Sequence, residues 1–318
     1  MKNAVRYFCL CVSPAIDATV RLPSAPRGEG EIFKDVSDEE NVGGKAVNVA
    51  RWLSIRGADV VCGGLLGEDN DRPFAHEMER YGIADGFLRV PGATRRNEMV
   101  VWPGGSMKLN RAAFPGLCAA DGADLGERML SKLAEGTDPA SAAAADRNVA
   151  IVSGSLPPAF AKDFYAKAIA FFRSLGMATV LDASGDAMRF GLDAEPDLIK
   201  PNADECADLI GFVPKTPEEF VRATEILRRK ARHVIISDGA SGAWFDGEFV
   251  PAPPVEASDT TAAGDTLLAE YCWRMFAEGS ADAGKWAVAA GSAACTMPGG
   301  APPDVDLVAR LKEVNEAV

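Results

Sequence analysis

The stretch VAIVSGSLPPAFAKDFYAKAIAFFRSLGMATVL, residues 149–181, contains two short apolar runs with a helical pattern between them. VAIV (149–152) and ATVL (178–181) have the length and the β-branched content of buried strands. A third run, HVIIS (233–237), also follows helical patterns of ten or more residues. This alternation predicts βαβ units, and therefore a mostly parallel central sheet with helices on both faces.

Four other segments complete the predicted organisation. Apolar residues at 3.6-residue spacing predict a helix over 267–276, which Gly279 should end. Residues from about 19 to 36 and from about 97 to 109 are predicted to be extended strands joined by Pro and Gly turns. On pattern alone, these strands form either a small sheet that covers the site or edge strands of the main sheet. The segment 136–147 is predicted to be a loop.

Composition narrows the classes of function. The chain has 318 residues, 47% of them hydrophobic, and a formal net charge of −13. That charge repels a phosphodiester backbone, so no nucleic-acid partner is expected, and a small anion needs local cationic or N–H donors. The seven cysteines form no CxxC pair, which indicates a reducing cytoplasm and no zinc site. Because no apolar run is long enough for a signal peptide or a membrane span, a cytoplasmic protein without membrane contact is predicted.

The motif NVGGKAVNVARWL (41–53) places two glycines before a helix. Gly43 and Gly44 let backbone N–H groups approach an anion or hydroxyl closely, while Lys45 and the helix N-terminus supply positive potential. Asn48 follows in the opening turns of the same helix. The alternative is a glycine turn before an amphipathic helix, with a lysine that is only solvated.

The motif SDTTAAGDTLLAEY (258–271) leads small residues into another helix. Consecutive N–H groups at Ala262, Ala263 and Gly264 can hold an anion, and Asp265 in the first turn can face it. This arrangement suits phosphoryl transfer, where neutralising oxygens and positioning the nucleophile matter more than a strong base. The alternative is an aspartate that merely interacts favourably with the helix dipole.

Two further motifs carry polar groups. In IVSGSLPPAF (151–160), Ser153, Gly154 and Ser155 follow a buried strand, where open α/β sheets bind phosphate or sugar oxygens. In LIKPNADECADLIG (198–211), Asn202 and Glu205 share a helical face and can order a hydrated Mg²⁺ ion. A strand-to-helix turn and a capping box are the respective alternatives.

Several motifs are absent from the sequence. It has no G-x-x-x-x-G-K-[ST] P-loop and no G-x-G-x-x-G fingerprint, which disfavours a Walker-type ATPase and a dinucleotide-dependent dehydrogenase. Its two histidines, His76 and His233, do not accompany a G-x-S-x-G elbow. A Ser-His-Asp hydrolase is therefore also disfavoured.

Taken together and in this order, the motifs resemble those of the ribokinase-like PfkB carbohydrate kinases, from residue 13 to about 302. The resemblance implies one kinase domain over 1–318, a three-layer α/β/α sandwich, with lid strands from about 12–40 and 95–112 and a possible homodimer through the lid. It also implies ATP and Mg²⁺. Asp265 would be the catalytic base, residues 262–264 the anion hole, and Asp17 of SPAID (13–17) a holder of sugar hydroxyls. The remaining implied positions form the nucleotide site: Lys200, Asn202, Ser237, Gly239 and Gly242, with Glu205 near Mg²⁺.

Within that family, GGKxxNVAR, TRRN (94–97), SGSLPP and LIKPN are most similar to the branch of 1-phosphofructokinase and tagatose-6-phosphate kinase. This similarity implies that Lys45 and Arg95 bind the phosphate already on the acceptor. It favours fructose 1-phosphate over tagatose 6-phosphate as the acceptor. An unphosphorylated sugar or a nucleoside is the alternative.

Three residues depart from the family pattern. Ala262, Ala46 and Glu270 stand where glycine is expected. If Ala262 must be left-handed, its methyl group strains the anion hole. A catalytically weak, regulatory protein that binds sugar phosphate is therefore a further alternative, although Asp265 and Gly264 are retained.

Overall fold

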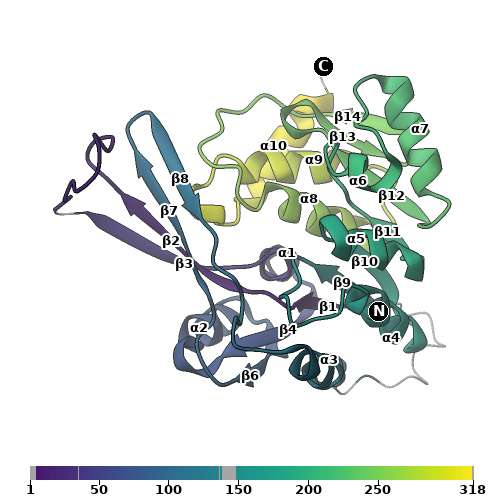
Figure 1. The fold of residues 1–318 in the computed structure, drawn as a ribbon. Helices are drawn as coiled ribbons and strands as arrows, with labels where there is room; N and C mark the ends of the chain where they lie inside the picture. Colours follow the sequence, from purple (N-terminus) through teal and green to yellow (C-terminus); the bar gives the residue numbers. More distant parts are fainter. Residues whose placement is uncertain (1–4, 35, 136, 138–147, 317–318) are drawn as a thin grey trace.

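The computed structural model describes residues 5–34, 36–135, 137 and 148–316 (Figure 1). Apart from Thr137, the predicted loop 136–147 lies outside these residues. None of the described helices is long and apolar enough to cross a bilayer.

The described chain contains a ten-stranded sheet in which all neighbours are parallel except β12–β13 and β13–β14. Its order is β14-β13-β12-β11-β10-β9-β1-β4-β5, and β6 also pairs with β4. The strands are β1 (Arg6–Cys11), β4 (Asp59–Gly67), β5 (Ala84–Asp85), β6 (Leu88–Val90), β9 (Val149–Ser153), β10 (Ala178–Asp182), β11 (Leu198–Ile199), β12 (His233–Ser237), β13 (Gly242–Phe245) and β14 (Glu248–Pro251). The runs that the sequence marked as strands are β9, β10 and β12, and the mostly parallel sheet is confirmed.

Helices cover both faces of this sheet. Side chains alternate along each strand, so apolar side chains point to both faces and pack against these helices. In β1, Tyr7 and Cys9 belong to one buried cluster with residues of α1, α2, α8, α9 and α10, and Phe8 and Leu10 belong to a second with residues of α3, α4, α5 and α7. The helices are α1 (Lys45–Ile55), α2 (Arg72–Tyr81), α3 (Ala119–Leu133), α4 (Phe164–Ser174), α5 (Gly185–Gly191), α6 (Cys206–Ile210), α7 (Pro217–Leu227), α8 (Ala263–Cys272), α9 (Ala283–Ala294) and α10 (Val305–Glu316). The predicted three-layer α/β/α architecture is therefore confirmed.

The helix predicted over 267–276 is longer than its apolar pattern. It begins at Ala263, and its last turn, Trp273–Glu278, is π-helical. Gly279 ends it in the left-handed conformation, with φ of 67°. The early start places Asp265, the predicted catalytic base, in the first turn of the helix.

A second sheet of four strands stands apart from the main one and projects from the body of the molecule (Figure 1). It has the order β3-β2-β7-β8, and its strands are β2 (Ala15–Arg21), β3 (Ser37–Gly43), β7 (Arg96–Trp102) and β8 (Gly105–Leu109). We call it the lid sheet. The alternative of edge strands in the main sheet is wrong, and most of the segment 19–36 connects β2 to β3 rather than forming strand.

Candidate active site

The start of α8 presents backbone N–H groups at the carboxyl edge of the main sheet. Ala262 is the N-cap residue, with φ of 63° and ψ of 2°, in the left-handed region. Its carbonyl accepts from the backbone and hydroxyl of Thr266, each at 2.9 Å. Because the first N–H groups of a helix have no acceptor within it, those of Gly264 and Asp265 are suited to hold an anion.

Asp265 lies in the first turn of α8 and is only 6% exposed. Its Oδ2 accepts a hydrogen bond of 2.8 Å from Nδ2 of Asn48, in α1. Burial and the negative charge of Asp182 raise the pKa of Asp265 to about 6, although Lys45, Asn48 and Lys200 act in the opposite direction. At neutral pH the carboxyl is therefore mostly ionised, yet more basic than an ordinary aspartate.

Asp182 ends β10 and is fully buried beside two lysines. Its Oδ1 lies 3.2 Å from Nζ of Lys45 and 3.3 Å from Nζ of Lys200. Burial alone would raise the pKa of Asp182, but Lys200 and Lys45 outweigh it and hold the pKa below its usual range. For Lys45, burial lowers the pKa, but the negative charges of Asp182, Asp265 and Glu205 together outweigh it and raise the pKa above its usual range. The cluster therefore holds two positive charges against one negative charge, next to Asp265.

The residues around this cluster lie at the ends of strands β9 and β10 and at Gly264, at the start of α8. Ser153, at the end of β9, pairs with Asp182 in the sheet and donates to its Oδ2 at 3.4 Å. A β-carbon built on Gly264 would lie 3.3 Å from Nζ of Lys200, so glycine lets the ammonium approach the helix start. Gly154 follows Ser153 with φ of 105°, and Ser155 is exposed.

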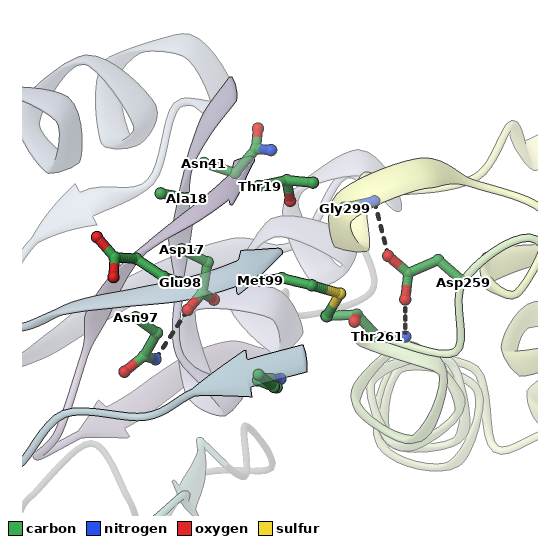
Figure 2. Close-up of a pocket in the computed structure, with 11 residues that line it drawn as sticks. Asp17, Ala18, Thr19, Asn41, Asn97, Glu98, Met99, Asp259, Thr261 and Gly299 are labelled. Atoms are coloured by element: carbon green, nitrogen blue, oxygen red, sulfur yellow. Dashed lines mark hydrogen bonds between the residues drawn. The ribbon is translucent and has the colours of Figure 1, made fainter. Parts of the chain in front are cut away.

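The lid sheet carries the predicted sugar-binding residue, Asp17 of β2. Asn97 of β7 donates to Asp17 Oδ1 at 2.8 Å (Figure 2). A β-carbon built on Gly43 would lie 1.9 Å from Asp17 Oδ2, so the carboxylate occupies the space that a side chain at Gly43 would need. Gly43 thus belongs to strand β3, while Gly44, with φ of 130°, makes the turn into α1.

A small pocket of about 20 Å³ lies between the lid sheet and the body, and Asp17 and Asn97 line it (Figure 2). Lys108 of β8 lines it from the lid and Asp259 from the body. The carboxylate of Asp259 accepts from the backbone N–H of Thr261 at 2.8 Å and of Gly299 at 3.0 Å. It therefore ties the loop before α8 to the turn near Gly299.

Arg95, the predicted phosphate ligand, lies just before β7. Its guanidinium donates to the backbone carbonyls of Ser13, Pro14 and Arg111 at 2.9, 3.3 and 3.2 Å. A guanidinium has five N–H donors, so two remain for an anion beyond these three.

Four of the predicted nucleotide-site residues line a separate cleft of about 850 Å³, and Lys200 and Glu205 are not among its lining residues. Asn202, Ser237, Gly239 and Gly242 border one part of it, and Gly264 borders another. Phe220, Leu267, Val255 and Val288 add apolar walls that the sequence motifs did not indicate. A cleft of this volume is large enough for a nucleotide, and it leads to the start of α8.

Asn202 and Glu205 form a reciprocal capping box. Glu205 Oε2 accepts from the N–H of Asn202 at 2.9 Å, and Asn202 Oδ1 accepts from the N–H of Glu205 at 2.8 Å. The described residues contain no cluster of three metal-ligating side chains. Since protein-bound Mg²⁺ commonly keeps several waters and uses one or two carboxylates with substrate phosphates, the donors fit a hydrated ion.

Sequence reasoning missed Asp182 and gave Asn97 no role. Asp182 immediately follows the strand run ATVL, so the rule that selected Ser153, a polar residue at the carboxyl end of a parallel strand, would also have selected it. Asn97 ends the quoted TRRN segment, but only the lid register, which pairs Asp17 with Asn97, brings the two side chains together.

The chain is similar to known proteins over most of its length. The model of the pfkB family of carbohydrate kinases matches residues 10–306. A 1-phosphofructokinase of Vibrio cholerae is 33% identical over 275 residues, which cover 84% of this chain and 82% of that protein. A 1-phosphofructokinase of Haloferax volcanii is 30% identical over 300 residues and covers 92% of both chains.

Solved structures share the fold at lower identity. Phosphofructokinase-2 of Escherichia coli in complex with potassium aligns with a TM-score of 0.84 and 21% identity, covering 98% of this chain and 99% of that one. Ribokinase of Arabidopsis thaliana in complex with ribose and ATP aligns with a TM-score of 0.74 and 20% identity, with the same coverage of each. By the extent of the family match and by these relatives, the chain belongs to the PfkB family of carbohydrate kinases and is a phosphotransferase of ribokinase-like fold.

Proposed function

We propose that this kinase transfers the γ-phosphoryl group of ATP to a primary hydroxyl of a ketohexose phosphate, with fructose 1-phosphate as the acceptor. The observation that carries the proposal is the position of Asp265. This buried carboxylate with a raised pKa stands at a helix N-terminus, between a nucleotide-sized cleft and the lysine cluster. The relatives named 1-phosphofructokinase support the choice of acceptor.

On the acceptor side, the lid holds the sugar. Asp17 is oriented by Asn97 and accepts hydrogen bonds from sugar hydroxyls. Arg95, with two donors to spare, binds the acceptor's existing phosphate. Holding the sugar at both ends fixes the reacting hydroxyl against Asp265, and such positioning supplies much of the rate enhancement in phosphoryl transfer.

Asp265 takes the proton of the acceptor hydroxyl. Its Oδ2 is held by Asn48, so Oδ1 is the oxygen available to the substrate. The N–H groups of Gly264 and Asp265 and the ammonium groups of Lys45 and Lys200 stabilise the charge on the transferring phosphoryl oxygens. Because the base must be ionised, kcat/KM is expected to fall as the pH decreases through about 6.

The cleft bordered by Ser237 and Gly239 holds the nucleotide, with its apolar walls against the base. Asn202 and Glu205 hold a hydrated Mg²⁺ ion near the nucleotide phosphates through water. When bound, this ion neutralises phosphate charge. The protein's own part is to keep Glu205 in place through the capping box with Asn202.

The test is ADP release with ATP and Mg²⁺ against fructose 1-phosphate, tagatose 6-phosphate, fructose 6-phosphate, ribose, fructose and adenosine. Rapid turnover of a phosphorylated ketose supports the proposal and names the substrate. Asp265→Asn is expected to lower kcat by roughly two to four orders of magnitude, since general-base catalysis contributes that much. Near-normal turnover of this variant would remove Asp265 from the mechanism.

Two other results would redirect the assignment. If an unphosphorylated sugar or adenosine is the best acceptor, Arg95→Ala should barely change its KM. If no acceptor reacts but sugar phosphates raise the Tm, the protein is a binding protein, as the left-handed Ala262 would favour.

A further inference from the structure

Arg51 is a buried arginine of α1 that contacts three other parts of the chain and one residue of its own helix. It is 5% exposed. Its Nη2 donates to the carbonyl of Val42 in β3 at 2.9 Å, and its Nη1 is 3.4 Å from the carbonyl of Gly300 and 3.3 Å from Oδ1 of Asn48. Its Nε lies 2.6 Å from Oε1 of Glu77 in α2. One guanidinium therefore joins a lid strand, the turn beside the anion hole and α2.

The carboxamide of Asn48 lies between Arg51 and Asp265. Its Nδ2 donates to the Asp265 carboxylate at 2.8 Å, and its Oδ1 accepts from Arg51 at 3.3 Å. An ionised carboxylate only accepts and a guanidinium only donates, so both partners require the same orientation of the amide. If Arg51 were absent, the amide would keep only its hydrogen bond to Asp265, so nothing on its oxygen side would hold it in place against the carboxylate.

We propose that Arg51 is a positioning residue for the base, because its guanidinium fixes the carboxamide of Asn48 in the orientation that donates to Asp265. The proposal rests on the proposed function, in which Asp265 is the base. Arg51 acts through Asn48 and does not touch the substrate. The contact with Gly300 extends the same control to the anion hole, since a β-carbon built on Gly300 would lie 3.5 Å from Cβ of Ala262.

A purely structural role for Arg51 predicts something different. The charged or titratable groups around Asp265 are Lys45 from α1, Asp182 from β10, Lys200 after β11 and the thiol of Cys11 from β1, and Asn48 from α1 is its hydrogen-bond donor. Arg51 is not among them, so a structural clamp would change only the stability of the fold. A positioning role also changes the titration of Asp265, because the N–H of Asn48 stabilises the ionised carboxylate.

The test compares Arg51→Lys with Arg56→Lys. Lysine keeps the charge but lacks the planar fork that reaches several acceptors at once. Arg56 is a control at the residue that follows α1, with a side chain 11% exposed and an ion pair to Glu270. The carboxyl titration of Asp265 is followed by ¹³C NMR, assigned with Asp265→Asn, and kcat and its pH profile are measured on the same variants.

In Arg51→Lys, the titration midpoint of Asp265 is expected to rise by roughly half a unit to one unit. We expect kcat to fall roughly tenfold, with a smaller change in KM. Arg56→Lys should leave the midpoint where it is in the wild type. Asn48→Ala should raise the midpoint at least as far as Arg51→Lys, and the double variant should match Asn48→Ala alone, since both changes remove one interaction.

An unchanged midpoint and kcat in Arg51→Lys, with a lowered Tm, would overturn the proposal. If Arg51→Lys does not fold, Asn48→Ala still tests the proposal. An unchanged titration midpoint of Asp265 in Asn48→Ala would show that Asn48 does not affect the base, and Arg51 could then not act through Asn48. Failure of the proposed function gives a different result: the wild type turns over no acceptor, while the midpoint still responds to Arg51→Lys.

Discussion

Ala262 is one of the few non-glycine residues of the described chain with positive φ. It caps α8 and is the first residue of the predicted anion hole. In the left-handed region the β-carbon crowds the backbone, at a cost of about 1–2 kcal/mol that glycine does not bear. Alanine has thus replaced the family's glycine at a position where the chain adopts the left-handed conformation. By contrast, Ala46 lies inside α1, where alanine is the most favourable residue.

We therefore predict that Ala262→Gly raises kcat a few-fold, since a relaxed cap lets the N–H groups adjust to the phosphoryl oxygens. Thermal unfolding should change little, because the relief of strain is offset by about 0.5–1 kcal/mol of added freedom in the unfolded chain. Steady-state kinetics and Tm check both parts. A drop in kcat would show that alanine is the better residue at this cap.

Asp265 also predicts a dependence of stability on pH. Its folded pKa of about 6 lies above the ordinary aspartate value of 3.8. Folding therefore favours the protonated form, and the stability that this group contributes is complete below about pH 4 and lost as the pH rises through 6. Asparagine cannot ionise, so Asp265→Asn should be more stable than the wild type above pH 7, by up to about 3 kcal/mol.

The measurement for this second prediction is urea unfolding of both proteins at pH 4.5, 6 and 7.5. The difference should grow with pH. Equal stability of the two proteins at pH 7.5 would contradict a raised pKa. The expected gain in stability together with lost turnover would identify a carboxylate kept for chemistry at the expense of the fold.

For single residues, the sequence motifs predicted which residue types lie at the site but not which side chains contact each other. Lys45 was selected for its positive charge beside two glycines. Its partner Asp182 is 137 residues away, and only the sheet order β1-β9-β10 brings the two together. The capping box of Asn202 and Glu205 was foreseen as an alternative because it depends on local spacing alone.

Among the elements, α8 carries a second departure from the family pattern. Glu270 replaces a glycine and is fully buried. Its Oε2 accepts from the indole of Trp52, in α1, at 2.8 Å and lies 3.3 Å from Nε of Arg56, which directly follows α1. Its Oε1 accepts from Arg274 at 2.9 Å. Both arginines also stack on Trp273, at 4.2 and 4.8 Å from its ring centre. The network joins the two helices that carry Asn48 and Asp265.

We predict that Glu270→Ala destabilises the protein by about 3–5 kcal/mol, because it leaves two largely buried guanidinium groups without their shared carboxylate. The control is Glu278→Ala, which removes the other partner of Arg274 at a side chain that is 37% exposed. That change should cost less than about 1 kcal/mol. Urea unfolding measures both, and similar losses in the two variants would contradict a special role for the buried pair.

The ends of α8 show what sequence patterns can locate in an element. Gly279 was correctly identified as its end because a left-handed cap needs glycine. The π-helical turn over Trp273–Glu278 was not foreseen, since the apolar spacing continues through it. The turn carries Trp273, whose ring centre lies 4.2 Å from the guanidinium of Arg56, and a contact between residues so far apart in the chain cannot be read from the apolar spacing.

For the whole molecule, the alternation of strands and helices predicted the main sheet, because burial on both faces gives continuous apolar runs. The same patterns left the lid sheet undecided between two arrangements. Its strands are amphipathic in either case, and only the pairing of β2 with β7, 80 residues away, separates them from the main sheet. The small pocket between lid and body follows from that packing.

The charge of the whole molecule yields a last prediction. The chain carries a net charge of −13, whereas the proposed substrates are anions and the proposed binding site includes a local cluster around Lys45 and Lys200. At about 0.01 M salt the screening length is roughly 30 Å, so the repulsive global field reaches an approaching substrate, and at 0.1 M it is roughly 10 Å. The attraction inside the buried cluster acts at contact and is screened much less.

We therefore expect kcat/KM for the sugar phosphate to rise roughly two- to threefold between 0.01 and 0.1 M salt, in contrast to the fall that is usual when a protein attracts its substrate by long-range charge. The series is run in potassium chloride and in tetramethylammonium chloride, so that screening is separated from a specific effect of potassium. A rise in both salts supports the argument. A fall in both would mean that the cationic cluster, rather than the acidic surface, determines the field that the substrate meets.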